Sequence, residues 1–274
     1  MILTGVCFAP LFSFSQQVWE VGAMLGASTY SGTLTPGLID PKQIHFAGGV
    51  LVRYNITRYF TIKGNVYDGT ISGNDEDATN PKNRQRNLNF TSNILDVGIN
   101  GEINLTGFEA SSRYFKTQYK TSPYLFGGVA IFHFDPEGFD PVTGQWVRLQ
   151  PLGTEGQGTP RYNDRTKYAL TQVSIPFGFG LKHNISEHWN LGFEFGWRKT
   201  FTGYLDDVSN TYVPNDYLSH FSGALAARMA IGNNPANLVY GDNVDRGNPN
   251  TDDWYMFGGV TITYTILPPY CPHF

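Results

Sequence analysis

The chain is poor in charge and has no long apolar run. Charged residues make up 15% of the 274 residues, whereas a soluble domain usually carries about 25%. A membrane-spanning helix needs roughly 18 consecutive apolar residues, and no window of this sequence offers them. A bundle of membrane helices is therefore excluded. The net charge of −4 and the lack of a basic run argue against nucleic acid as a partner.

Cysteine is also scarce, since only Cys7 and Cys271 occur. Residues 1–15 are largely apolar and end in a small-x-small pattern, which is typical of the cleavage site of a secretory signal peptide. We expect the mature chain, residues 16–274, to be a single domain that keeps only Cys271. In an oxidising compartment such a cysteine is either a free thiol or half of an intermolecular bridge.

Aromatic residues and glycine, in contrast, are abundant, at 15% of the chain and 31 residues respectively. The mean hydropathy is nevertheless −0.27. Eight segments alternate with period two, as β-strands do. They cover residues 19–25, 44–53, 60–66, 95–105, 124–134, 172–182, 189–201 and 253–266. In seven of them one face is mostly apolar and the other polar; the segment at 124–134 is apolar on both faces, and its orientation stays open.

Such strands fit either a soluble sandwich or a membrane barrel. In a sandwich the apolar face points inward, whereas in an outer-membrane barrel it meets lipid and the polar face lines a narrow lumen. Glycine recurs on the polar face, which suits a lumen that eight strands leave only wide enough for side chains. On a solvated sandwich surface those glycines would only weaken the strands. This pattern favours the barrel.

The lengths of the connections support the same choice. The links after the second and sixth strands are short (55–57 and 184–187), and the one after the fourth is intermediate (107–120). The other four links are long: 31–43, 72–88, 135–167 and 204–252. Alternation of short turns and long loops is the outer-membrane pattern. We therefore predict an all-β, eight-stranded antiparallel transmembrane barrel in the bacterial outer membrane, with extracellular long loops and periplasmic termini. Aromatic residues after the short turns, with Trp19 and Tyr264, would form a periplasmic girdle.

The polar faces place four acids and four bases in the lumen. These residues are Glu20, Arg53, Lys63, Asp96, Glu102, Lys182, Glu194 and Arg198. Because an unpaired charge in a narrow interior is costly, we expect a buried ion-pair network. Glu194 and Arg198 are expected to form a structural pair. Such a network would close the lumen and disfavour a channel.

Little in the sequence indicates catalysis. The six histidines show no metal-ligand spacing, and neither a GxSxG motif nor a P-loop occurs. We predict no enzyme activity, metal or cofactor. His133 lies near the expected outer rim, where a lipid-modifying site would lie, but we interpret it as an interfacial residue. The acidic segment at 75–77 lacks the spacing of a calcium loop and is expected to be a solvated turn.

The last long loop contains a helical pattern. Leu218, Phe221, Leu225 and Met229 recur at helical spacing, with Asn215 as a candidate cap and Gly232 as a candidate end. We predict a short helix that either covers the barrel or docks a partner.

Several segments resemble a known family. They are Trp19 to Gly22, Gly26 to Leu34, the LDDVS stretch Leu205, Asp206, Asp207, Val208 and Ser209 with Tyr212, Arg246 to Asn248, and Cys271 with Pro272. Together they are similar to the PorG-type outer-membrane β-barrels of Bacteroidetes, components of the type IX secretion and gliding machinery, or to their paralogues.

The resemblance implies a non-catalytic barrel that anchors the periplasmic ring of this machinery to the outer membrane. The implied partners are a ring lipoprotein and the protein that accompanies it, besides outer-membrane lipid. Cys271, beyond the last strand, would form a disulfide or a contact with the lipoprotein, or remain a terminal thiol. A lipid-modifying enzyme, or a small pore or adhesion barrel that uses its external loops, stays as the alternative.

Overall fold

Eight long strands form a closed antiparallel barrel. The computed structural model describes residues 18–35, 37–111, 119–232, 242 and 244–267. Each strand pairs with the next, and β1 pairs with β10 to close the sheet. The barrel strands are β1 (Val18–Ser31), β2 (His45–Asn55), β3 (Phe60–Asn74), β4 (Asn89–Asn104), β5 (Thr121–Phe134), β8 (Thr171–Asn184), β9 (Trp189–Lys199) and β10 (Trp254–Ile266). The predicted fold is confirmed.

The two faces of the strands have opposite chemistry. Apolar side chains point outward, as Leu25 and Ile99 do at 62% and 64% exposure, while the alternate polar side chains are buried. This is the reverse of a soluble protein and is the arrangement of a barrel surrounded by lipid. In β5, whose orientation the sequence left open, Phe126 and Phe132 face the lumen and Ile131 faces outward.

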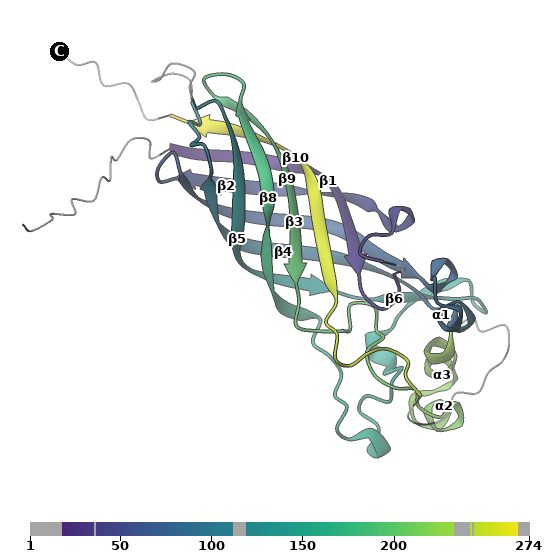
Figure 1. Cartoon of the computed structure of the whole chain (residues 1–274). Helices are drawn as coiled ribbons and strands as arrows, with labels where there is room; N and C mark the ends of the chain where they lie inside the picture. Colours follow the sequence, from purple (N-terminus) through teal and green to yellow (C-terminus); the bar gives the residue numbers. More distant parts are fainter. Residues whose placement is uncertain (1–17, 36, 112–118, 233–241, 243, 268–274) are drawn as a thin grey trace, which may run out of the picture.

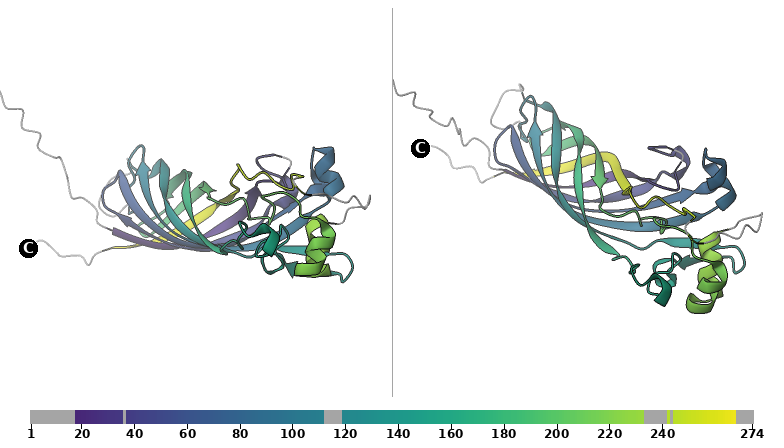
Figure 2. Two further views of the ribbon diagram at one scale, coloured as in Figure 1. Left: turned by 90° about the horizontal axis from the view of Figure 1, so that it is seen from below. Right: turned by 60° about the horizontal axis from the view of Figure 1, so that its bottom comes forward.

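The connections at the two ends of the barrel differ in length and in secondary structure. The short turns, the start of β1 and the end of β10 lie at one end, and the helices and long loops lie at the other (Figure 1). Figure 2 shows the same separation from two further sides. At the short-turn end, the ring of Tyr264 lies 5.3 Å from that of Trp189, and the ring of Trp19 lies 4.7 Å from that of Tyr54.

The helical pattern of the last loop forms two helices rather than one. They are α2 (Asn215–Ser222) and α3 (Ala224–Ile231), which Gly223 separates with a φ of 95°. The predicted cap is also wrong, because Pro214 is the N-cap of α2 and Asn215 is its first residue. Gly232 does end α3. Met229 joins the core cluster that continues from the barrel, so α3 covers the barrel end, as one of the two predicted roles requires.

The remaining elements also lie at the long-loop end. A hairpin of β6 (Glu137–Asp140) and β7 (Gln145–Arg148) pairs with the start of β4 through Thr91 and Glu137. A short helix α1 (Pro81–Arg86) and four single-turn 3-10 helices complete this end: η1 (Pro41–Gln43), η2 (Asp75–Asp77), η3 (Gln150–Leu152) and η4 (Pro160–Tyr162). We call the loop segments 75–88, 135–170, 200–232 and 244–253 the crown.

Candidate functional site

The middle of the lumen holds a cluster of three bases and two acids. Pairing of β2 with β3 sets Arg53 opposite Lys63, so these like charges need shared anions. Glu102 supplies one, with its carboxylate 3.2 Å from Arg53 Nε and 3.6 Å from Lys63 Nζ, and it also pairs with Lys182. Glu194 supplies the other and lies 2.6 Å from Lys63 Nζ. The charges come from five strands and hold opposite walls of the barrel together.

Glu194 and Arg198 do not form the pair that the sequence suggests. Arg198 Nε lies 3.8 Å from Asp96 Oδ2, and Arg198 Nη1 donates to the carbonyl of Gly196 at 2.8 Å. The two residues are about 13 Å apart along the strand, and each side chain reaches a different partner. Each is instead paired across the lumen.

Glu20 also departs from the expected ion pairing, since its hydrogen bonds come from neutral donors. Asn55 Nδ2 and Asn190 Nδ2 donate to its carboxylate at 2.6 and 3.1 Å. The bore around these groups is filled: a Cβ on Gly196 would lie 2.6 Å from Phe126 Cζ. None of the eight predicted lumen charges is more than 3% exposed. Such a lumen has a packed interior and not the open bore of a porin.

Arg246 organises the crown in a second buried network. Its guanidinium lies 3.0 Å from Glu155 Oε1 and 3.7 Å from Asp207 Oδ2. It also donates to the carbonyl of Ala230 at 3.0 Å and to that of Asp207. Arg86 donates in turn to the carbonyl of Arg246. One side chain thus joins the loop after β5 to both ends of the loop after β9.

The acidic segment at 75–77 is only in part the solvated turn that we expected, because Glu76 is exposed but Asp75 is not. Asp75 is fully buried and forms a two-pronged pair with Arg86, whose Nε and Nη2 lie 2.6 and 2.7 Å from its oxygens. It also accepts a hydrogen bond from the backbone N–H of Leu88 at 3.0 Å. The expectation missed this pair because the arginine that neutralises Asp75 is the last residue of α1, 11 residues further along the chain.

Three of the segments that carry the family resemblance meet in or beside the crown: 26–34, 205–212 and 246–248. All six residues of the LDDVS stretch and its tyrosine are buried: Leu205, Asp206, Asp207, Val208, Ser209 and Tyr212. Tyr30 Oη donates to Asp206 Oδ2 at 2.6 Å, and Thr33 Oγ1 donates to the carbonyl of Val208 at 3.3 Å. Gly247 packs so closely here that a Cβ on it would lie 2.5 Å from the carbonyl oxygen of Val208. Residues far apart in the chain therefore form one structural unit.

Three buried carboxyls of the crown have raised pKa values. Burial raises the pKa of Asp206 to about 7 and that of Asp207 to about 6. Burial, with the negative charge of Asp206 nearby, also places the pKa of Asp253 well above its ordinary value. Asp253 accepts a hydrogen bond from the backbone N–H of Leu205 at 3.0 Å. We therefore expect the crown to respond to pH near neutrality.

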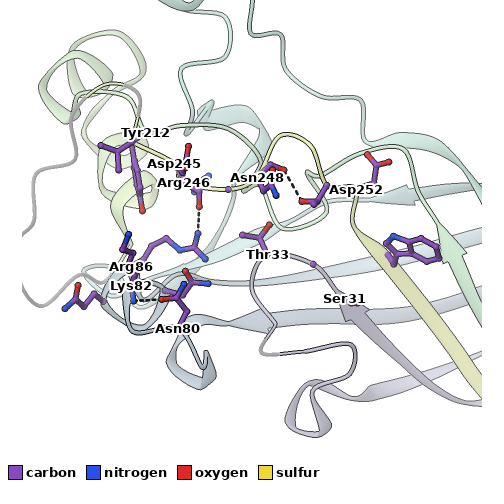
Figure 3. Close-up of a pocket in the computed structure, with 17 residues that line it drawn as sticks. Ser31, Thr33, Asn80, Lys82, Arg86, Tyr212, Asp245, Arg246, Asn248 and Asp252 are labelled. Carbon is purple, nitrogen blue, oxygen red and sulfur yellow. Dashed lines mark hydrogen bonds between the residues drawn. The ribbon is translucent and has the colours of Figure 1, made fainter.

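A cleft of about 940 Å³ opens beside this network (Figure 3). One side is α1 with Asn80, and the other is the segment before β10 with Asn248. Thr33 lies between them, and Arg86 and Arg246 also line the cleft. Because these segments approach only in the folded crown, sequence reasoning did not find the cleft.

Other predicted residues lie elsewhere. Cys271 and the expected signal peptide at 1–15 are outside the described residues. His133 is on the outer surface at the long-loop end, with Nδ1 2.9 Å from Thr171 Oγ1. Within the described part of the chain, no group of three or more metal-ligating side chains could hold an ion.

The described helices are all too short or too polar to cross a membrane.

Comparisons with known proteins give a family and distant structural relatives. No curated protein matches the chain. Ail, the attachment invasion locus protein of Yersinia pestis, is 8% identical with a TM-score of 0.41, over 92% of this chain and 100% of that chain. OprG of Pseudomonas aeruginosa is 8% identical with a TM-score of 0.39, over 91% and 96%. Neisserial surface protein A is 10% identical with a TM-score of 0.37, over 89% and 95%.

A family model described as "Domain of unknown function (DUF6089)" matches residues 1–142, slightly more than half of the chain. The chain belongs to this family.

Proposed function

We propose that this barrel is a non-catalytic component of the bacterial outer membrane that anchors the periplasmic ring of the type IX secretion and gliding machinery. The observation that carries the proposal is the packed lumen, in which none of the eight predicted charged residues is more than 3% exposed. A barrel with a filled bore suits a membrane anchor better than a conduit. The resemblance to PorG-type barrels supplies the identity of the machinery.

The proposal assigns the short-turn end to the periplasm. Strand β1 begins there and β10 ends there, so Cys271 would follow the last strand on the side of the ring lipoprotein. Arg58 and Tyr59 are exposed on the first short turn, and the side chain of Ile185 is 55% exposed on the second. These turns provide the surface on which the ring would dock.

Purification of the tagged protein from native membranes in mild detergent tests the proposal. We expect the ring lipoprotein and its accompanying protein to co-purify. Arg58→Glu at the short-turn end should lower their recovery several-fold, whereas Arg148→Glu, at another exposed arginine that lies in the crown, should not. Recovery of the barrel alone, or an equal loss with both variants, would overturn the anchoring role.

Cys271 needs a separate measurement. Non-reducing electrophoresis of wild-type and Cys271→Ala membranes should show a higher-mass band that only the mutant lacks. If no such band disappears, the disulfide is wrong, and co-purification alone then decides whether the ring docks without it.

A second candidate is binding through the external loops. The observation that favours it is the cleft in the crown, because four loop segments are built around a large concave surface.

A further inference from the structure

Two hollows of opposite chemistry adjoin at the rim between the crown and the barrel wall. The first is the cleft of about 940 Å³. The second, which we call the rim groove, has a volume of about 310 Å³ and is lined by Ser31, Leu38, Phe177, Trp197 and Trp254. Ser31 and Trp254 line both hollows. They also face each other in the pairing of β1 with β10. A ligand at this rim could therefore occupy both.

The rim groove is built from aromatic rings on the outer wall. The ring of Phe177 lies 5.9 Å from that of Trp197 and 6.0 Å from that of Trp254. Leu38, 62% exposed, comes from the loop after β1 and forms another part of the lining. The rim groove lies on the lipid-facing side of the barrel, so a hydrocarbon chain can enter it directly from the membrane. The groove suits an acyl chain, because apolar surface buried against apolar groups is what stabilises such a chain.

The cleft suits a different group. Its lining is rich in side-chain amides and hydroxyls, contributed by Thr33, Asn80, Asn83, Gln85, Asn248 and Thr251. Each amide offers both a donor and an acceptor, and each hydroxyl can serve as either. This mixed capacity matches the closely spaced hydroxyls of a saccharide. The lining also has charges of both signs, three bases (Lys82, Arg86 and Arg246) and two acids (Asp245 and Asp252), so the cleft is not specialised for an anion alone.

We propose that the crown binds a glycolipid of the outer leaflet, with its saccharide in the cleft and an acyl chain in the rim groove. Trp254, at the junction, would contact both parts. The inference rests on the part of the proposed function that directs the long loops outward, and it is independent of ring anchoring. An ordinary phospholipid could fill the rim groove but would leave most of the cleft empty.

The test uses the full chain in phosphatidylcholine nanodiscs, with bound lipid counted by native mass spectrometry. The probes are rough-type lipopolysaccharide, its core oligosaccharide without acyl chains, and phosphatidylethanolamine. We expect the lipopolysaccharide to bind tightest, the oligosaccharide weakly, and the phospholipid no better than the surrounding lipid. Equal binding of lipopolysaccharide and phospholipid would overturn the saccharide site. Equal binding of lipopolysaccharide and free oligosaccharide would overturn the acyl site.

Matched variants separate this site from a general aromatic girdle. Trp254→Leu should weaken lipopolysaccharide binding about tenfold, a loss of roughly 1.4 kcal/mol, whereas Trp189→Leu at the short-turn end should not change it. Equal losses would mean that the rings act only as a girdle.

A second pair of variants tests the cleft without disturbing the barrel. Asn83→Ala with Gln85→Ala should preserve α1, since alanine favours helix, and should weaken binding of the lipopolysaccharide. Arg84 lies on the same helix but does not line the cleft, so Arg84→Ala should leave binding of the lipopolysaccharide unchanged. No effect of the double substitution would remove the saccharide from the cleft. Because no ring protein is present, none of these outcomes depends on the anchoring role.

Discussion

The lumen and the crown both bury charged networks, but they assemble them differently. In the lumen the charges stand on adjacent or facing strands, and Glu102 alone contacts three cations. In the crown the charges lie on loops, and Arg246 reaches partners 91 and 39 residues away in the chain, Glu155 and Asp207. The crown also keeps buried carboxyls whose pKa values are raised. The lumen network thus holds a regular wall closed, whereas the crown network defines the shape of irregular loops.

Removal of the central anion of the lumen should have the largest effect. In Glu102→Gln, Arg53 and Lys63 would keep Glu194 as their paired carboxylate, and Lys182 would lose the carboxylate with which it pairs. Loss of one member of a buried ionic cluster costs about 3–5 kcal/mol, and the three cations put this variant at the upper end. We expect a matching fall in the free energy of unfolding, measured by urea titration in lipid vesicles with tryptophan fluorescence.

The same chemical change on the outer surface provides the control. Asp68 is exposed and accepts a hydrogen bond from Asn93 at 3.0 Å. Asp68→Asn should leave the unfolding free energy nearly unchanged. Similar losses in the two variants would contradict a special role for the lumen cluster.

The crown should open on its own when its central arginine is removed. Arg246→Met would leave Glu155 and Asp207 without their guanidinium, at a cost of about 3 kcal/mol. The cost is at the lower end because Glu155 keeps the backbone N–H groups of Ser209 and Asn210, each at 3.0 Å. We expect faster proteolysis of the crown while the barrel resists. Arg161→Met, at an exposed pair with Asp242, should not accelerate cleavage. Unfolding of the whole chain would show that crown and barrel are not separate.

The sequence predicted the wall far better than the crown, for a physical reason. Alternation along a strand records which side chains meet lipid, so Glu20 and Glu102 could be assigned to the lumen from their positions in this alternation. The alternation does not say which strands face each other across the bore. The pairing of Glu102 with Lys182 was therefore not predictable. In β5 both faces are apolar because the lumen also needs rings such as Phe126.

Crown contacts leave no periodic signal. The partners Tyr30 and Asp206 are 176 residues apart, and nothing local to either indicates the other. The β6–β7 hairpin was missed although its turn, from Asp140 through Pro141 to Gly144, has ordinary turn residues. The break between α2 and α3 depends on Gly223 adopting a positive φ, which glycine permits but does not require.

The raised pKa values of Asp206 and Asp207 predict that the stability of the crown changes with pH between about 4 and 7, whereas Asp140 makes no contribution in this range. Folded Asp206 and Asp207 hold their protons up to pKa values of about 7 and 6, above the ordinary 3.8. The folded crown therefore binds more protons in this window, and its stability falls as the pH rises. Asp140, whose pKa Arg228 lowers to about 2, stays charged throughout.

Proteolysis at pH 5 and pH 8, normalised to an unstructured peptide, tests this response. We expect the crown to be cleaved several-fold more slowly at pH 5. The pKa of Asp206 depends on the neighbouring side chains of Tyr30 and Asp253 and on the charges of Arg86 and Arg246. Asp206→Asn leaves these neighbours in place and removes only the titrating carboxyl, so it should reduce the pH dependence. An unchanged dependence in that variant would assign the effect to another group.

The smallest effect is expected at the surface of the crown, because solvent stabilises an exposed charge almost as well as an ion-pair partner does. Arg148 Nε lies 2.6 Å from Asp135 Oδ2, but the two side chains are 54% and 28% exposed, so Arg148→Ala should cost about 0–1 kcal/mol. Arg228 on α3 pairs with Asp140, which belongs to the β6–β7 hairpin as Arg148 does. The carboxylate of Asp140 is fully buried. Arg228→Ala should therefore cost more, about 1.5 kcal/mol as for a hydrogen bond to a charged group. Hydrogen exchange of the β6–β7 amides measures both, and equal protection in the two variants would mean that burial does not decide the strength of crown ion pairs.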